Sequence, residues 1–290
     1  MAPEAASSAL CENRFLRHCH QALRENRLVL PTIPDISLKI RRAINDPKAN
    51  NSKIAKVVQI DPVITARLIQ IANSPLYRGR RRIESCPEAL TRLGLKAAQH
   101  LITSFALKMV FKAKTRLIHK YMQELWQHSS YVAAICAVLA HKTPGFDPDR
   151  AILAGLVHDI GAVPVLTFAD AHIDLIDQVQ NLTQAVAKLR GPVGVAIMRA
   201  WHFPEDFETV VWEAENWFRN QSQEPDYVDL VLVAQLHSFI GTPKIHDCPR
   251  LDQIPAYRKL LAGRLDANTS LNILEAAKEE IWQIQNLLAA

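Results

Sequence analysis

Residues 147–161 read DPDRAILAGLVHDIG, and this stretch decides the fold class. Its opening Asp-Pro pair is a helix start, because an aspartate caps free backbone amides and a proline fits the first helical turn. Residues 150–159 are apolar almost all round, which predicts a helix at the centre of a hydrophobic core. This helix ends on His158 and Asp159, a neutral imidazole and a carboxylate that together can bind a divalent ion.

Helix signals continue on both sides of this stretch, and strand alternation is hard to find. Asn51 and Ser52 can cap one helix, Asp61 with the following proline starts another, and Ser85 with Glu88 forms a capping box. Further helices are predicted at Asp35–Ile44, Leu95–Phe111, Leu117–Ala140, Ile173–Val179, Gly194–Trp201, Phe207–Phe218, Val228–Ile240 and Ile273–Leu288. Only 9 of 290 residues are glycine, fewer than the turns of strand-rich or Rossmann-type folds require. The sequence therefore predicts an all-α, multi-helix bundle.

The composition excludes several classes of protein. Apolar residues make up 49% and charged residues 22%, a balance that a disordered chain does not have. We take residues 132–140 as the longest strongly apolar stretch. It is far shorter than the roughly 20 residues of a membrane-spanning helix. The N-terminus lacks the basic lead and apolar core of a signal peptide. The five cysteines are spread without a CxxC pair, which indicates reduced thiols, so we expect a cytoplasmic protein with no membrane partner.

The net charge of +5 hides two halves of opposite sign. Residues 1–115 contain 20 Lys and Arg against 8 Asp and Glu, a net charge of +12. Residues 116–290 contain 14 against 21, a net charge of −7. This asymmetry indicates two lobes that have different neighbours or that attract one another.

The chain resembles the HDOD (HD-related output) domains of bacterial signalling proteins from about Leu30 to Ile240. The motifs that carry the resemblance are Leu30-Pro31-Thr32-Ile33-Pro34, Asn45-Asp46-Pro47, Asp61-Pro62-Val63-Ile64-Thr65-Ala66-Arg67-Leu68, Ala72-Asn73-Ser74, Glu88-Ala89-Leu90, Arg92-Leu93-Gly94, Trp126, His128-Ser129, Leu153–Gly161 and Trp201-His202-Phe203-Pro204. The resemblance implies an N-terminal extension over residues 1–29 and a family-specific helical lobe over 30–115. A degenerate HD-like helical lobe with a C-terminal helix would follow over 116–290.

The same resemblance implies a metal site that is incomplete. HD-type phosphohydrolases hold their metal with a histidine, a His-Asp pair and a distant aspartate, and His128, His158 and Asp159 match the first three positions. Gln235 stands where the distant aspartate is expected, and a neutral amide lacks the negative charge that a hard divalent cation needs. We expect His128, His158 and Asp159 to be vestigial ligands that bind a metal weakly or not at all.

Two further substitutions point the same way. By alignment with HD relatives, Arg190 and Glu215-Asn216 stand where further histidines are common, and a guanidinium would repel a cation. We therefore expect no enzymatic activity and no cofactor, with Mn, Fe or Mg bound only if the HD site is retained. The alternative to a metal site is that His158 and Asp159 form hydrogen bonds to each other and to a helix end.

The expected function is regulatory: a stand-alone, non-enzymatic signal transduction protein that contacts signalling proteins in trans. One alternative is a metal-dependent phosphohydrolase of nucleotides or cyclic dinucleotides with the reduced ligand set. A second alternative is a nucleic-acid-binding regulator that uses Arg78, Arg80, Arg81 and Arg82, since clustered arginines in a loop can grip phosphates. Against this stands the interpretation of a solvated loop whose arginines pair with the acidic lobe.

Aromatic residues gather late in the chain, at Trp201, Phe203, Phe207, Trp212, Trp217 and Phe218. At these spacings most of the rings are expected in the core, which is the usual place for large apolar side chains on amphipathic helices. A surface patch that docks a partner is the alternative.

Overall fold

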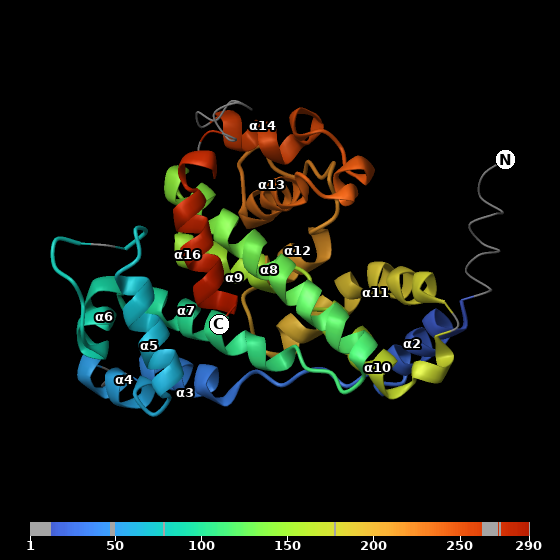
Figure 1. Ribbon diagram of the computed structural model, residues 1–290, viewed down its shortest axis with the longest axis horizontal. Helices are drawn as coiled ribbons and strands as arrows, with labels where there is room; N and C mark the ends of the chain where they lie inside the picture. The colour runs from blue at the N-terminus through green and yellow to red at the C-terminus, as the bar shows by residue number, and fades with distance from the viewer. Residues whose placement is uncertain are drawn as a thin grey trace.

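The computed structural model describes residues 13–46, 50–77, 79–176, 178–262, 272 and 274–289, and this described part is built from helices without a strand (Figure 1). The first half contains α2 (Arg14–Arg24), α3 (Asp35–Asn45), α4 (Asn51–Val58), α5 (Pro62–Ala72), α6 (Cys86–Leu93), α7 (Leu95–Leu107) and the 3-10 helix η1 (Lys108–Val110). The second half contains α8 (Arg116–Lys142), α9 (Pro148–Val157), α10 (Ala162–Ala171), η2 (Ile173–Leu175), α11 (Val179–Ala200), α12 (Glu205–Glu213), α13 (Tyr227–Phe239), η3 (Pro243–Asp247), η4 (Leu251–Gln253), α14 (Pro255–Ala262) and α16 (Lys278–Ala289). The all-α prediction is confirmed.

Several helix boundaries follow from the capping residues that the sequence indicated. The Asp61 side chain accepts hydrogen bonds from the amides of Val63 and Ile64 at the start of α5. Ser85 accepts from the amide of Glu88 at the start of α6, and Gly94, at φ 82°, ends that helix. The predicted cap of α4 is wrong by one residue. The side chain of Asn50 accepts a hydrogen bond from the amide of Lys53, and Asn51 already lies in the helix.

Other helix predictions need correction. The segment predicted as a helix at Ile173–Val179 forms only the short turn η2, and α11 begins at Val179. α11 then continues through Pro192, although a proline removes one backbone hydrogen bond. Its buried residues recur every three or four positions, so packing of this face outweighs the proline. α12 ends at Glu213 instead of Phe218, and α2, α10 and α14 were not predicted.

The core is centred on α8 and α9, as Figure 1 shows near the middle of the view. Gly155 makes their close approach possible, because a β-carbon there would lie 2.5 Å from Ala133 Cα. α7 packs on α9 from the first half of the chain, α13 packs on α8, and α16 lies against α8 and touches α5. Trp201 ties the halves together: its Nε1 donates to Pro31 O at 2.8 Å, and its own carbonyl accepts from Arg41 at 2.9 Å.

One stretch of the described residues, Pro148–Ala171, is long and apolar enough to cross a membrane by length and composition. It is longer than the apolar stretch 132–140 that the sequence reading singled out. In the fold, 89% of its most apolar 18-residue window is buried, and the stretch is divided into α9 and α10. Its apolar character is thus accounted for by packing against neighbouring helices. The described cysteines are free thiols, of which Cys19, Cys86 and Cys136 are buried.

Candidate functional site

The three residues predicted as vestigial metal ligands come together. His128 lies in α8, and His158 with Asp159 lies directly after α9. One ligand atom from each side chain falls within 4.8 Å of the others, and this is a cluster of the kind that could hold a metal ion. The two imidazole rings meet edge to face, with their centroids 5.2 Å apart.

Two glycines allow this convergence. Gly155 brings α9 against α8 at Ala133, a little more than one helical turn beyond His128. Gly161 follows the His-Asp pair, and a β-carbon there would overlap the carbonyl oxygen of Arg190 and lie 2.5 Å from the amide of Gly194. The backbone of α11 therefore rests directly on the turn that carries Asp159.

The imidazoles have a defined orientation. His158 Nδ1 lies 2.7 Å from Gly155 O, which leaves Nε2 facing Asp159 Oδ2 at 3.4 Å. Phe239 of α13 stacks on the ring of His128 at an interplanar angle of 3°. Burial, with the nearby His158, lowers the pKa of His128 to about 3, so this imidazole is neutral at pH 7. The Nε2 atoms of both histidines are buried without a hydrogen-bond partner among the described residues.

A guanidinium occupies the space beside this cluster. Arg190 Nη1 lies 2.9 Å from Asp159 Oδ1, and Arg190 Nη2 forms an ion pair with Glu215. Burial by itself would raise the pKa of Asp159, but the neighbouring His158 and Arg190 outweigh it and hold that pKa well below its usual range. Lys244 of η3 adds a second basic group, with its Nζ 3.9 Å from Glu215 Oε1 and 4.3 Å from the centre of the Phe239 ring. Two basic side chains thus match two carboxylates at the site.

Gln235 is fully buried in α13, one turn before Phe239 and on the same face of the helix. Its Nε2 donates to Ala214 O at 2.6 Å. The cluster itself thus offers two imidazoles and one carboxylate, and that carboxylate is already bonded to Arg190. A hydrolytic Mg²⁺ or Mn²⁺ site relies on carboxylates to neutralise the ion, so this set of donors does not fit one.

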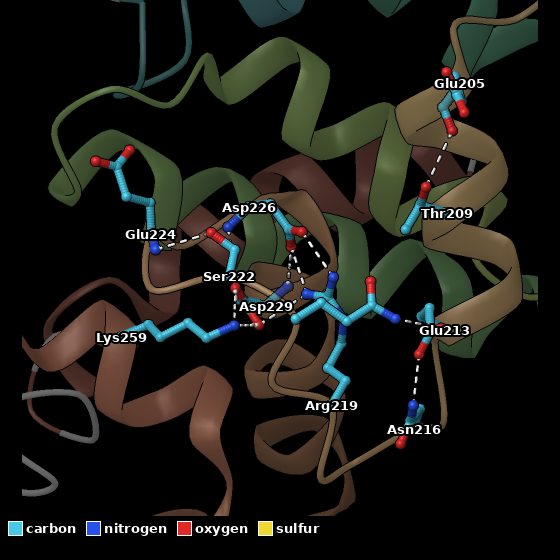
Figure 2. Close-up of polar contacts among 11 residues, drawn as sticks. Glu205, Thr209, Glu213, Asn216, Arg219, Ser222, Glu224, Asp226, Asp229 and Lys259 are labelled. Atoms are coloured by element: carbon cyan, nitrogen blue, oxygen red, sulfur yellow. Dashed lines mark hydrogen bonds and ion pairs between the residues drawn. The ribbon is translucent and has the colours of Figure 1, made fainter.

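A buried ion network holds the loop that presents Glu215. Figure 2 shows Arg219 reaching Asp226 and Asp229, with Lys259 of α14 approaching from the other side. Arg219 Nη1 lies 2.8 Å from Asp226 Oδ1 and 3.0 Å from Asp229 Oδ1, and Lys259 Nζ lies 3.3 Å from Asp229 Oδ2. Asp226 and Asp229 also form the capping box of α13. Paired charges therefore fix the connection between α12 and α13 at the end that leads into α13.

The arginine loop is separate from the cluster. Arg78 lies outside the described residues, and Arg80, Arg81 and Arg82 are exposed. Arg81 pairs with Glu88 at the start of α6, which belongs to the same basic half. The expectation that the loop arginines pair with the acidic half is therefore wrong for Arg81. Arg92 supports the loop by donating to the carbonyls of Ala72 and Arg81.

The aromatic residues divide between core and surface. Trp201 and Phe207 are buried, as expected. Trp212 and Phe218 are 58% and 62% exposed, so part of the aromatic group lies on the surface.

Lys244 and Phe239 were missed as site residues by sequence reasoning. Phe239 sits at helical spacing from Gln235, which could have indicated a shared face. No spacing signal points to Lys244, which reaches the site from a short 3-10 turn. The bridge from Arg190 to Asp159 and Glu215 was also not predicted, although all three residues were singled out.

Comparison with known proteins gives a consistent result. The family model described as the HDOD domain matches residues 30–216. A solved structure from Shewanella amazonensis SB2B, provisionally named a metal-dependent phosphohydrolase, is 27% identical, with a TM-score of 0.78 over 95% of this chain and 99% of that one. An HDOD domain protein of unknown function from Geobacter sulfurreducens is 24% identical, with a TM-score of 0.67 over 97% and 98%. An uncharacterised protein of Treponema pallidum (strain Nichols) is 25% identical over 196 residues, which are 61% of this chain but only 36% of that protein.

Proposed function

The chain belongs to the HDOD domain family, and we propose that it is a cytoplasmic, non-enzymatic regulator that binds signalling proteins in trans. On this proposal the HD-like site is a structural remnant that has lost hydrolysis. The family assignment rests on the HDOD match, which covers most of the chain.

The observation that carries the proposal is the bridge from Arg190 to Asp159 and Glu215. A hydrolytic metal site needs an excess of negative charge to hold the ion, whereas here a fixed guanidinium neutralises the carboxylate of the His-Asp pair. An incoming divalent ion would have to displace that guanidinium, whose side chain is only 13% exposed. Because Gln235 is neutral, it adds no attraction that could offset this displacement.

Surface aromatics support action through protein contacts. Trp212 projects from α12 in the acidic half of the chain, next to Gly191 of α11, and Phe218 follows in the loop after α12. Exposed aromatic side chains are enriched in protein–protein interfaces, since they bury large area at little entropic cost. A partner with a basic, apolar docking segment would match this face.

Metal binding tests the loss of hydrolysis. Calorimetric titration of the purified, metal-stripped protein with Mn²⁺ and with Fe²⁺ under anaerobic conditions is expected to show weak binding or none. The same titration of His158→Ala separates the cluster from adventitious surface sites. Tight binding by the unmodified protein that His158→Ala abolishes would overturn the proposal.

Hydrolysis is the second candidate, and the convergence of His128, His158 and Asp159 within 4.8 Å favours it. The name of the Shewanella amazonensis structure points the same way. A panel of nucleotides and cyclic dinucleotides, incubated with the protein and added Mn²⁺, Fe²⁺ or Mg²⁺, separates the two functions. Turnover that disappears in both His128→Ala and Asp159→Asn would establish the enzyme.

The exposed Arg80 and Arg82 favour a third candidate, a regulator that binds nucleic acid. Neither side chain has a hydrogen bond or ion pair among the interactions of the described residues. Because these arginines have no internal partner among the described residues, they can contact phosphates without breaking a bond within the protein.

A further inference from the structure

A cavity of about 540 Å³ lies where α5, the end of α7 with η1, and the first half of α8 meet. Cavities that hold small molecules usually measure roughly 300–1,000 Å³ and are mostly apolar with a few polar groups. The rings of Phe105, Phe111 and Trp126 and the side chain of Met122 line this one. α5 and α7 come from the first half of the chain and α8 from the second, so a ligand here would touch both.

Trp126 contributes its ring to the wall of this cavity. Its side chain is buried, with 5% of the residue exposed, and its ring meets Phe111 edge to face at 4.9 Å. The ring therefore adds aromatic surface to the wall, against which a flat or branched apolar group can pack.

The rim of the cavity is basic. Arg67 of α5 is half-buried, and its guanidinium lies 6.0 Å from the centre of the Phe105 ring. No hydrogen bond or ion pair to Arg67 occurs among the described residues, while burial lowers its pKa. Lys112, which also lines the cavity, is exposed. The carboxylate of Asp61 also lines the cavity, but it accepts the two amides that begin α5 and is thereby already engaged.

This cavity is distinct from the histidine cluster. Trp126 and His128 are two positions apart in α8, which turns their side chains about 200° away from one another. None of the residues of the histidine cluster lines the cavity. An occupant here therefore needs no metal and does not rest on the proposed function.

We propose that this cavity binds a small organic anion in which an aromatic or branched apolar body carries a carboxylate, sulfonate or phosphate group. The apolar body packs among Phe105, Phe111 and Met122. The ring of Trp126 packs against the same apolar body, and Arg67, with Lys112 at the rim, binds the anionic group. Because both halves of the chain line the cavity, such a ligand would stabilise their present arrangement.

The test uses two probes that differ in charge, 1-anilinonaphthalene-8-sulfonate and the uncharged N-phenyl-1-naphthylamine. Fluorescence titration of the full chain gives the affinity for each. Arg67→Gln is expected to weaken binding of the sulfonate by about tenfold or more, as loss of a charge-assisted contact does, and to change binding of the uncharged probe less than about twofold. Lys142→Gln, an exposed cation at the far end of α8, is the matched control and is expected to change neither.

Site specificity is read from the indole N–H signals in a ¹H–¹⁵N spectrum, where Trp126→Phe identifies the signal of Trp126. That signal is expected to move as the sulfonate saturates the protein. A signal that stays in place at saturation, or equal effects of Arg67→Gln and Lys142→Gln, would overturn the proposal. Equal weakening of both probes by Arg67→Gln would also overturn it, because Arg67 would then shape the cavity instead of binding the anion. If Arg67→Gln fails to fold, as judged by circular dichroism, Lys112→Gln takes its place with the same expected selectivity.

Discussion

Arg190 donates a hydrogen bond from Nη1 to Asp159 Oδ1 over 2.9 Å, although the two residues are 31 positions apart in the chain. They meet because Gly161 has no side chain, so that α11 rests on the turn after the His-Asp pair. The second nitrogen of the same guanidinium pairs with Glu215, whose loop is anchored by Arg219. A guanidinium of the protein itself thus pairs with the carboxylate of the His-Asp pair.

Removing the internal cation and restoring an acid should create metal affinity. We expect Arg190→Ala combined with Gln235→Asp to bind Mn²⁺ at least about tenfold more tightly than the unmodified protein, because single partners around a metal already change affinity by 10–100-fold. Isothermal calorimetry measures the difference. Arg199→Ala, an exposed arginine of the same helix, serves as control, and equal affinities for all three proteins would contradict the prediction.

Gly161 should be intolerant of a β-carbon. Gly161→Ala is expected to destabilise the fold by about 3 kcal/mol or more, since overlap with Arg190 O and Gly194 N forces the backbone apart. Gly191→Ala, in α11, meets only ordinary contacts at 3.6 Å and should be neutral or stabilising by about 0.5–1 kcal/mol. Urea denaturation of both variants checks this, and similar stabilities would contradict the proposed close approach.

The buried network of Figure 2 should matter far more than an exposed pair of the same chemistry. The side chains of Arg219 and Asp229 are 2% and 0% exposed, so Arg219→Met leaves the buried Asp229 carboxylate with only Lys259 as a paired cation among the described residues and should lower stability by about 3 kcal/mol. The side chains of Arg250 and Asp252 are 77% and 56% exposed, and Arg250→Met should change stability by less than about 1 kcal/mol. Thermal or urea unfolding measures both effects, and equal losses would rule out a special role for the network.

Asp149 should make stability depend on pH. Burial raises the pKa of Asp149 from 3.8 to about 7, although the hydrogen bond donated by Tyr77 opposes this rise. The folded protein therefore retains a proton that the unfolded chain loses near pH 4, and this carboxyl costs stability progressively as the pH rises from about 4 to about 7. Asp149→Asn removes that loss.

We therefore expect the stability of Asp149→Asn, relative to the unmodified protein, to increase between pH 5 and pH 8 by on the order of 2 kcal/mol. Denaturation in urea at the two pH values measures it. Asp174→Asn, at an exposed carboxylate, should show no such trend. A pH-independent difference for Asp149→Asn would contradict the burial argument.

The arginine loop gives a test between protein and nucleic-acid partners. If the proposed function holds, a fluorescent oligonucleotide should not bind to the arginine loop. The unmodified protein and the triple variant Arg80→Ala/Arg81→Ala/Arg82→Ala should then behave alike, without binding that falls steeply with salt. Anisotropy measured from 50 to 200 mM salt reads this directly, because contacts to phosphates produce a strong dependence on salt. Binding that falls steeply with salt and is lost in the triple variant would favour the nucleic-acid candidate.

The sequence by itself determined the all-α class, many of the helix starts and the three residues of the histidine cluster. The first two features are local or nearly so: Asp61 and Ser85 cap helices within three residues of themselves, and apolar spacing defines a helical face. The ligand set of the histidine cluster was indicated by the family resemblance. Local signals were wrong where packing opposed them. α11 runs through Pro192 because burial of its long apolar face outweighs the intrinsic preference of proline. The predicted helix at Ile173–Val179 is only the turn η2.

Only the tertiary structure decided which charges meet. Arg190, Glu215 and Lys244 come from a helix, a loop and a 3-10 turn, and no spacing in the chain relates them. The place of the Trp126 ring in a cavity wall could likewise be recognised only once three helices enclosed the cavity. Electrostatic attraction and burial depend on distance in space, and that distance is set by how helices pack, so the chemistry of both sites follows from the fold.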